Sequence, residues 1–71
     1  MKNYRLTDFP EGAIITGING QISWYILGPD GRTEIYSEGG HNSRSEALKK
    51  ARRWRRENFN FVVSSYEAKT R

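Results

Sequence analysis

The chain has 71 residues, with 12 lysines and arginines against 8 aspartates and glutamates, so its formal net charge is +4. A chain of this length forms one domain with a thin core, which excludes a two-domain enzyme and a deep, enclosed active site. Because it has no cysteine and only one histidine, disulfides and thiolate metal sites are excluded, and a zinc site is not expected.

Nothing in the sequence indicates targeting or membrane insertion. No apolar run approaches the roughly 18 residues of a membrane span. The first nine residues, MKNYRLTDF, lack the apolar stretch of a signal peptide. We therefore expect a soluble, cytoplasmic protein without a membrane partner.

The first half of the chain has the pattern of a three-stranded antiparallel β-meander. Asn19-Gly20 separates two apolar runs and is the strongest short signal for a hairpin, because both turn positions need positive φ. The sequence GPDG, with Pro29 in second place and Gly31 left-handed, predicts a type I turn before the next strand. The predicted strands are residues 13–18, 21–27 and 32–38.

The alternation of side chains along these strands predicts two different faces. Trp24 and its apolar neighbours in the second strand face the core, and Tyr25 faces the other way. In the third strand Ile35 is the apolar position, so Tyr36 is expected beside Tyr25 on the face away from the helix. With Arg32 these tyrosines would make a stacking or groove-reading surface. The alternative is ordinary cross-strand pairing of aromatic side chains.

A helix is predicted at residues 44–57, after Gly39-Gly40 ends the third strand. Ser43 and Glu46 have the spacing of a capping box at its start. Residues spaced by 3, 4 and 7 form a stripe that packs on the sheet, namely Ala47, Leu48, Ala51, Trp54 and Asn58. The opposite stripe faces solvent and consists of Lys49, Arg52, Arg53 and Arg56.

The last segment has an alternating pattern. Phe59, Phe61 and Val63 predict a fourth strand at about 59–66. The predicted fold class is therefore α+β: a three-stranded antiparallel β-meander packed on one C-terminal α-helix (βββα), with an additional C-terminal β-strand. We expect a single small domain over residues 1–71, with residues 1–10 as a short N-terminal arm.

No catalytic constellation is visible, so neither an enzyme nor a cofactor is expected. Glu34 and Glu38 share a strand face, which ordinary solvent-facing polarity explains. His41 follows the glycines without a recognisable partner and is interpreted as an exposed loop residue. The surrounding EGGHN lacks the GxxxxGK[ST] pattern of a phosphate loop.

The basic excess is concentrated in the predicted helix. Residues 44–57 carry a net charge of +5, and the rest of the chain carries −1. Five of the seven cations are arginines, which fork onto phosphate better than lysines do, and no acidic residue interrupts the outward stripe. Such a segment attracts polyanions. The alternative is a merely solvated helix face. The candidate nucleic-acid-binding cations are Arg44, Lys49, Lys50, Arg52, Arg53 and Arg56.

The segment from Phe9 to Arg53 resembles the small N-terminal, arm-type DNA-binding domains of tyrosine-recombinase integrases. The similar features are DFP, the strand NGQISWYI, the turn GPDGR and the helix start S-x-x-EA. The resemblance implies a three-stranded sheet, backed by one helix, that enters the major groove of DNA. The positions that it implies for groove contact are Tyr25, Arg32, Glu34 and Tyr36.

A second, shorter resemblance concerns the approach to the helix. GGHNSRSEALKKA is similar to the last part of double-stranded-RNA-binding domains, where basic residues at a helix start hold phosphates. It implies this role for Arg44, Lys49 and Lys50.

Two functional hypotheses remain. The first is a small nucleic-acid-binding protein that contacts duplex DNA, favoured over RNA, mainly electrostatically through the basic helix, with groove reading by the sheet face. The second is a phage- or mobile-element-encoded interaction module, an inhibitor or adaptor, that binds an acidic protein partner. Exposed strand edges would suit β-augmentation by such a partner. The protein would be a monomer, or a homodimer through an unpaired edge strand.

Overall fold

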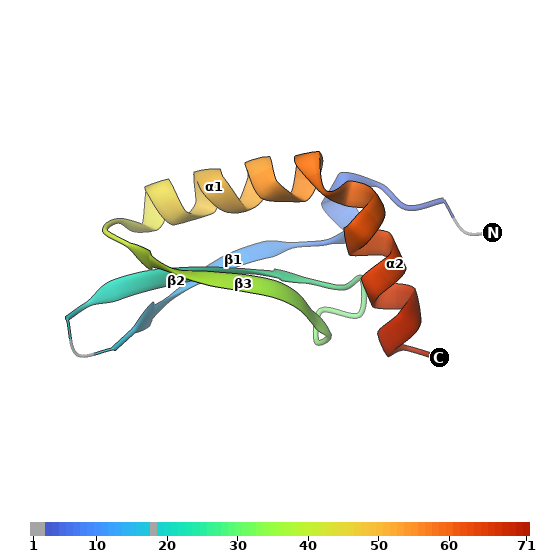
Figure 1. The fold of residues 1–71 in the computed structure, drawn as a ribbon, viewed down its shortest axis with the longest axis horizontal. Coiled ribbons are helices and arrows are strands. Elements are labelled where there is room, and N and C mark those ends of the chain that lie inside the picture. The colour runs from blue at the N-terminus through green and yellow to red at the C-terminus, as the bar shows by residue number, and fades with distance from the viewer. Residues whose placement is uncertain (1–2, 18) are drawn as a thin grey trace.

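The computed structural model describes residues 3–17 and 19–71. Three antiparallel strands in the order β1-β2-β3 form a sheet, and α1 lies lengthwise across one of its faces (Figure 1). The elements in chain order are a short 3-10 helix η1 (Leu6–Asp8), β1 (Glu11–Thr16), β2 (Gln21–Leu27), β3 (Glu34–His41), α1 (Arg44–Glu57) and α2 (Phe59–Lys69). The α+β class, the β-meander and the helix that follows it are confirmed.

The C-terminal segment is a helix, so the predicted fourth strand is wrong. Phe59, Val62, Val63 and Tyr66 lie at helical spacing and pack toward the core, where Val62 is fully buried. Phe61, the middle residue of the alternating pattern, is 53% exposed. The helical period of the apolar residues therefore decides the structure of this segment.

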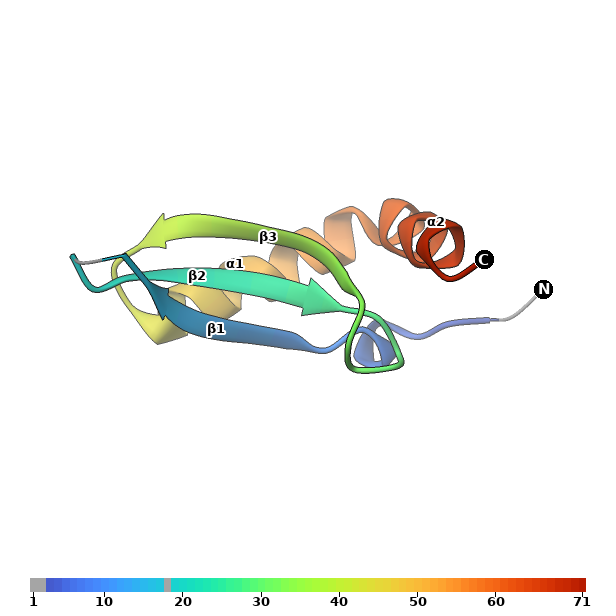
Figure 2. The ribbon, with the colours of Figure 1, turned by 90° about the horizontal axis from the view of Figure 1, so that it is seen from below.

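The connection between the two helices explains why no strand forms there. Only Asn58 separates α1 from α2, and both its backbone N–H and its Nδ2 donate to the carbonyl of Trp54, at 2.9 Å each. The chain thus turns within one residue, without the length needed to return to an edge of the sheet. As a result α2 stands across the end of the sheet (Figures 1 and 2).

The two turns of the meander differ in how well they follow the prediction. β1 ends at Thr16, and β2 begins at Gln21 as predicted; residue 18, the predicted end of the first strand, lies outside the described residues. Gly17 and Gly20 take φ of 80° and 70°. The β2–β3 turn is as predicted, with the Gly31 N–H donating to the Gly28 carbonyl at 2.9 Å and Gly31 at φ 70°. Hydrogen bonds from the Thr33 hydroxyl, the Thr33 N–H and the Arg32 N–H lower the pKa of Asp30 to about 2.

A bulge in β3 reverses the predicted facing of one tyrosine. The register between β2 and β3 skips Ile35, so both Ile35 and Tyr36 lie on the side of the sheet that α1 covers. Ile35 is buried, and the Tyr36 ring stacks on Trp54 with a centroid distance of 4.4 Å. The expectation that Tyr36 stands beside Tyr25 on the outer face is therefore wrong.

A second irregularity in β3 changes the position of the histidine. The strand continues through Gly39-Gly40, with Gly40 at φ 88°, and ends at His41 opposite Ile22. His41 is only 5% exposed, and its Nε2 lies 3.5 Å from Glu38 Oε1. The interpretation of His41 as an exposed loop residue is wrong, because the extra residue in the bulge turns its side chain toward the core.

The core lies between the sheet and the two helices. Trp24 is 1% exposed, as the strand alternation predicts, and Leu48 and Trp54 pack half-buried against it. The buried core residues are Phe9, Ala13, Trp24, Ile26, Ile35, Ala47, Ala51 and Val62. Among residues 3–17 and 19–71, no helix has both the length and the apolar character needed to cross a bilayer.

Candidate nucleic-acid interface

The orientation of α1 about its own axis is fixed at its start and along its buried side. Ser43 Oγ accepts a hydrogen bond from the Glu46 N–H at 3.2 Å and caps the helix. Ala47 and Ala51 are fully buried, and because they are small they let the helix approach the sheet closely. The stripe predicted to face solvent is exposed along its length: Lys49, Arg52, Arg53 and Arg56.

One arginine of α1 has a structural position that the sequence interpretation missed. Arg55 is 9% exposed, and its Nη1 donates to the Phe9 carbonyl at 2.8 Å and to Glu11 Oε1 at 2.9 Å. The other carboxylate oxygen of Glu11 accepts from Arg52 Nε. Arg55 follows Ala51 by four residues, so its place on the buried stripe is the signal that could have identified it.

The electrostatics at Glu11 follow from these contacts. Partial burial raises the pKa of the Glu11 carboxyl, but the hydrogen bond from Arg52 and the charges of Arg55 and Arg52 outweigh burial. The net effect is a pKa below the ordinary glutamate value. The carboxylate stays charged at neutral pH and holds the start of β1 against the last turns of α1.

Two cations at the start of α1 are less available for phosphate than the resemblance to RNA-binding domains implies. Arg44 Nη1 donates to the carbonyl of Ala13 at 2.8 Å, which ties α1 to β1. Lys50 Nζ lies 3.5 Å from Glu46 Oε1. Lys49, the third residue implied by that resemblance, is exposed and has no ion-pair partner within the described part of the chain.

The outward face of α1 is basic, but its charges are partly compensated. Arg53 Nε lies 3.2 Å from Glu57 Oε2, and Arg52 is paired with Glu11, so the expectation that no acidic residue interrupts this face is wrong. Arg56, like Lys49, forms no ion pair with any residue that the structure describes. The Arg53–Glu57 pair is exposed on both sides and contributes at most about 1 kcal/mol, so a phosphate can replace this carboxylate at little cost. Glu11 is partly buried, but Arg52 is exposed and contacts it through Nε, so its other guanidinium N–H groups can reach a phosphate.

The candidate residues of the sheet do not come together. Tyr25 lies on the outer face of the sheet, and its half-buried ring packs against Gly12 of β1. Arg32 lies exposed in the β2–β3 turn, and Tyr36 lies on the opposite side of the sheet. Glu34 is exposed in β3, and none of the three strands contains a lysine or arginine. The uncovered face of the sheet (Figure 2) therefore offers no cation to a phosphate backbone.

Both open edges of the sheet are occupied in part by donors from the helices. The Pro10 carbonyl points toward β2, since it accepts a hydrogen bond from the Leu27 N–H. Carbonyls alternate in direction along a strand, so the Ala13 carbonyl, three residues on, points to the open side of β1. Arg44 donates to it there. On the other edge Lys69 Nζ donates to the Glu34 carbonyl at 2.8 Å. Cations on edge strands oppose pairing with a further strand, which counts against β-augmentation and against a homodimer through these edges.

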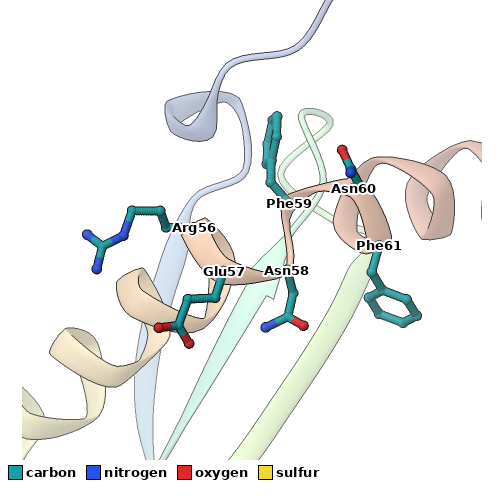
Figure 3. A pocket seen from close by; sticks show the side chains of 6 residues that line it. All are labelled: Arg56, Glu57, Asn58, Phe59, Asn60 and Phe61. Atoms are coloured by element: carbon teal, nitrogen blue, oxygen red, sulfur yellow. The ribbon is translucent and has the colours of Figure 1, made fainter.

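Two hollows border α1, and neither is enclosed. At the corner between the helices a hollow of about 400 Å³ is lined by residues 56–61. The Arg56 side chain extends away from those of the other lining residues, and Phe59 and Phe61 point in opposite directions (Figure 3). A smaller hollow of about 200 Å³ lies between α1 and β3. The described residues contain no group of His, Asp or Glu side chains that could hold a metal ion.

No protein-family model, curated protein or solved structure matches this chain.

Proposed function

We propose that this protein binds nucleic acid, duplex DNA in the first place, by placing the outward face of α1 against the phosphate backbone. The observation that carries the proposal is the row of exposed cations at spacings of 3, 4 and 7, namely Lys49, Arg52, Arg53 and Arg56. This row is about 10 Å long at the rise of an α-helix. The opposite side of the helix is fixed to the sheet, so the cations are held in one orientation.

The mode of binding follows from the residue types. Lysine and arginine contacts to phosphate position a protein on nucleic acid but do not read its sequence. Lys49 and Arg56 have no ion-pair partner among the described residues, so their charge is uncompensated. Arg53 can exchange Glu57 for a phosphate oxygen, and Arg52 can contact a phosphate with the guanidinium N–H groups that Glu11 leaves free. Four such contacts to duplex DNA correspond to a log–log salt slope of about −3 to −4. The sheet contributes little, because its exposed face is neutral or acidic.

The test is a titration with unrelated duplexes at several salt concentrations. Lys49→Ala with Arg56→Ala should weaken binding evenly across sequences and flatten the salt slope by about two units, because each lost phosphate contact removes about one. Both side chains are exposed, and neither forms an ion pair with a residue that the structure describes, so the fold should persist. The matched control is Arg5→Ala with Arg71→Ala, which removes the same charge from exposed positions outside α1 and should leave the slope nearly unchanged.

The proposal fails if the Lys49 and Arg56 variant keeps the wild-type slope. It also fails if the protein has no nucleic-acid affinity at about 50 mM salt, where phosphate contacts are strong. Recovery of a stable complex with an acidic protein after nuclease treatment would then favour the interaction-module hypothesis.

A further inference from the structure

Three aromatic side chains from three elements form a second exposed surface, here called the aromatic strip: Tyr36, Trp54 and Phe61. The rings of Tyr36 and Trp54 are stacked at 4.4 Å with an interplanar angle of 8°, and Phe61 meets Trp54 edge-on at 6.1 Å. Tyr36 is 38% exposed and Phe61 is 53% exposed. Large aromatic residues exposed side by side are informative, since a folded chain normally buries them.

The aromatic strip is continuous with the basic face of α1. Trp54 lines the hollow of about 200 Å³ between α1 and β3, and Lys50 and Arg53 line the same hollow. Arg53 is also a member of the outward row of cations, so this hollow connects the aromatic strip to the basic face of α1. Two carboxylates, Glu38 and Glu57, also line this hollow. Glu57 pairs with Arg53, and Glu38 lies near His41, so each has a basic neighbour.

We propose that the aromatic strip binds an unpaired nucleobase, so that the ligand of this protein includes a single-stranded segment. This inference rests on the proposed binding of phosphates by α1. Proteins that bind single strands combine a basic track for the backbone with aromatic rings on which bases stack. Here the cations of α1 form the track, and Phe61 and Tyr36 offer exposed ring surface supported by Trp54.

The structure favours a nucleobase over an apolar peptide as the occupant. A peptide needs no basic border, whereas a base on the aromatic strip places its phosphate beside Arg53 and Lys50. A duplex presents its phosphates to α1 but keeps its bases stacked within the helix, so it does not reach the aromatic strip. Comparing a single-stranded with a duplex ligand therefore distinguishes binding by the aromatic strip from binding by α1.

The test compares a short oligothymidylate with a duplex of the same length at one salt concentration. Trp24 is 1% exposed, so a base can stack against a tryptophan only at Trp54, and a Trp54→Phe variant identifies the part of the fluorescence change that comes from this ring. We expect oligothymidylate, but not the duplex, to quench this fluorescence. Phe61→Ala should weaken oligothymidylate binding roughly 5- to 150-fold, the effect of losing one stacked base, and should leave duplex binding unchanged.

Two further variants keep the test decisive. Phe61→Leu retains an apolar side chain at this position but removes the ring, and it should lose affinity as Phe61→Ala does. Ile14→Ala removes a similarly exposed side chain, 56% exposed on β1, and should bind both ligands as wild type does. Thermal unfolding of each variant checks that the fold is intact.

The outcomes distinguish this inference from the proposed function. If both Phe61 variants bind oligothymidylate like wild type, or if this ligand leaves the tryptophan fluorescence unchanged, the aromatic strip does not hold a base. Duplex binding that still depends on Lys49 and Arg56 would then leave the proposed function standing. If neither ligand binds at low salt, the proposed function fails first. A peptide that occupies the aromatic strip while oligothymidylate does not would also overturn the inference.

Discussion

At the scale of single residues, Glu11 shows how one carboxylate joins two elements. It accepts hydrogen bonds from Arg52 and Arg55, and the Arg55 side chain is only 11% exposed. Without Glu11, the Arg55 guanidinium keeps only its bond to the Phe9 carbonyl. A buried cation that loses its partner is costly, because water cannot replace the lost contact.

We therefore expect Glu11→Ala to lower the free energy of unfolding by about 3 kcal/mol, the lower end of the range for breaking a buried pair. Denaturant unfolding at neutral pH measures the change. The control is Glu67→Ala, an exposed glutamate of α2 without an ion pair in the described residues, which should change stability by at most about 0.5 kcal/mol. Equal effects of the two substitutions would show that the contacts of Glu11 are not stabilising.

The same carboxylate predicts a dependence of stability on pH. The folded-state pKa values of Glu11 and Asp30 lie below their ordinary values of 4.5 and 3.8, with Asp30 at about 2. Groups of this kind stabilise the fold above the unfolded-state pKa and lose that contribution as the pH falls through the folded-state pKa. The stability that these two carboxyls contribute should thus be constant above about pH 5 and should fall between about pH 4.5 and about pH 2.

Unfolding by denaturant at a series of pH values measures this dependence. Asp30→Asn should be less stable than wild type at neutral pH and should show a shallower fall on acidification. A stability that stays level down to about pH 2 would contradict the prediction.

Residue patterns predicted the inward positions well where the strand alternation is regular. Trp24 is buried as expected, and the turn at Gly31 has the predicted geometry. Tyr36 was misplaced because it follows the bulge at Ile35, and one extra residue reverses the facing of the positions after it. His41 was misplaced because β3 continues through Gly39-Gly40, where the sequence predicted that the strand ends. Alternation within a single strand cannot reveal a bulge, because the skipped residue is defined only by pairing with β2.

At the scale of elements, α2 is held at the β2–β3 turn by a close approach. Gly28 lies against the ring of Tyr66, and a Cβ on Gly28 would collide with that ring. We expect Gly28→Ala to lower stability by about 1–3 kcal/mol, as overpacking does, by displacing Tyr66 and with it α2. Chemical denaturation measures the loss.

A double-mutant cycle identifies the cause of that loss. In a Tyr66→Ala background the ring is absent, so Gly28→Ala should have almost no further effect. Equal costs of Gly28→Ala in both backgrounds would show that the effect comes from the backbone at Gly28 and not from its contact with α2.

The sequence left the type of this last element ambiguous. Phe59, Phe61 and Val63 fit a strand, whereas Phe59, Val62, Val63 and Tyr66 fit a helix equally well. Tertiary packing decides between the two, because Val62 and Tyr66 reach the core only when the segment is helical. The basic face of α1 was predictable, because the helical period alone determines which side chains of a regular helix share a face. The partial neutralisation by Glu11 was not, since it depends on how β1 lies beside α1.

At the scale of the whole molecule, the charge is separated between the two layers. The sheet strands contain glutamates but no lysine or arginine, whereas α1 carries a net charge of +5. Under the proposed function, a polyanion would approach one side of a body that measures 43 × 21 × 15 Å. The molecule would meet nucleic acid with α1 foremost and the bare face of the sheet turned away.

The β1–β2 hairpin lies at the end of the sheet opposite α2 (Figure 1). Ile14 and Ile15 near its tip are 56% and 69% exposed, whereas Phe9, Ile26 and Val62 are fully buried. Local opening needs little energy where few apolar contacts are lost. We therefore expect the amides at Ile14 and Ile15 to exchange with solvent through local opening, while those around Ile26 exchange only on global unfolding. By this argument the end of the sheet beside α2 opens last.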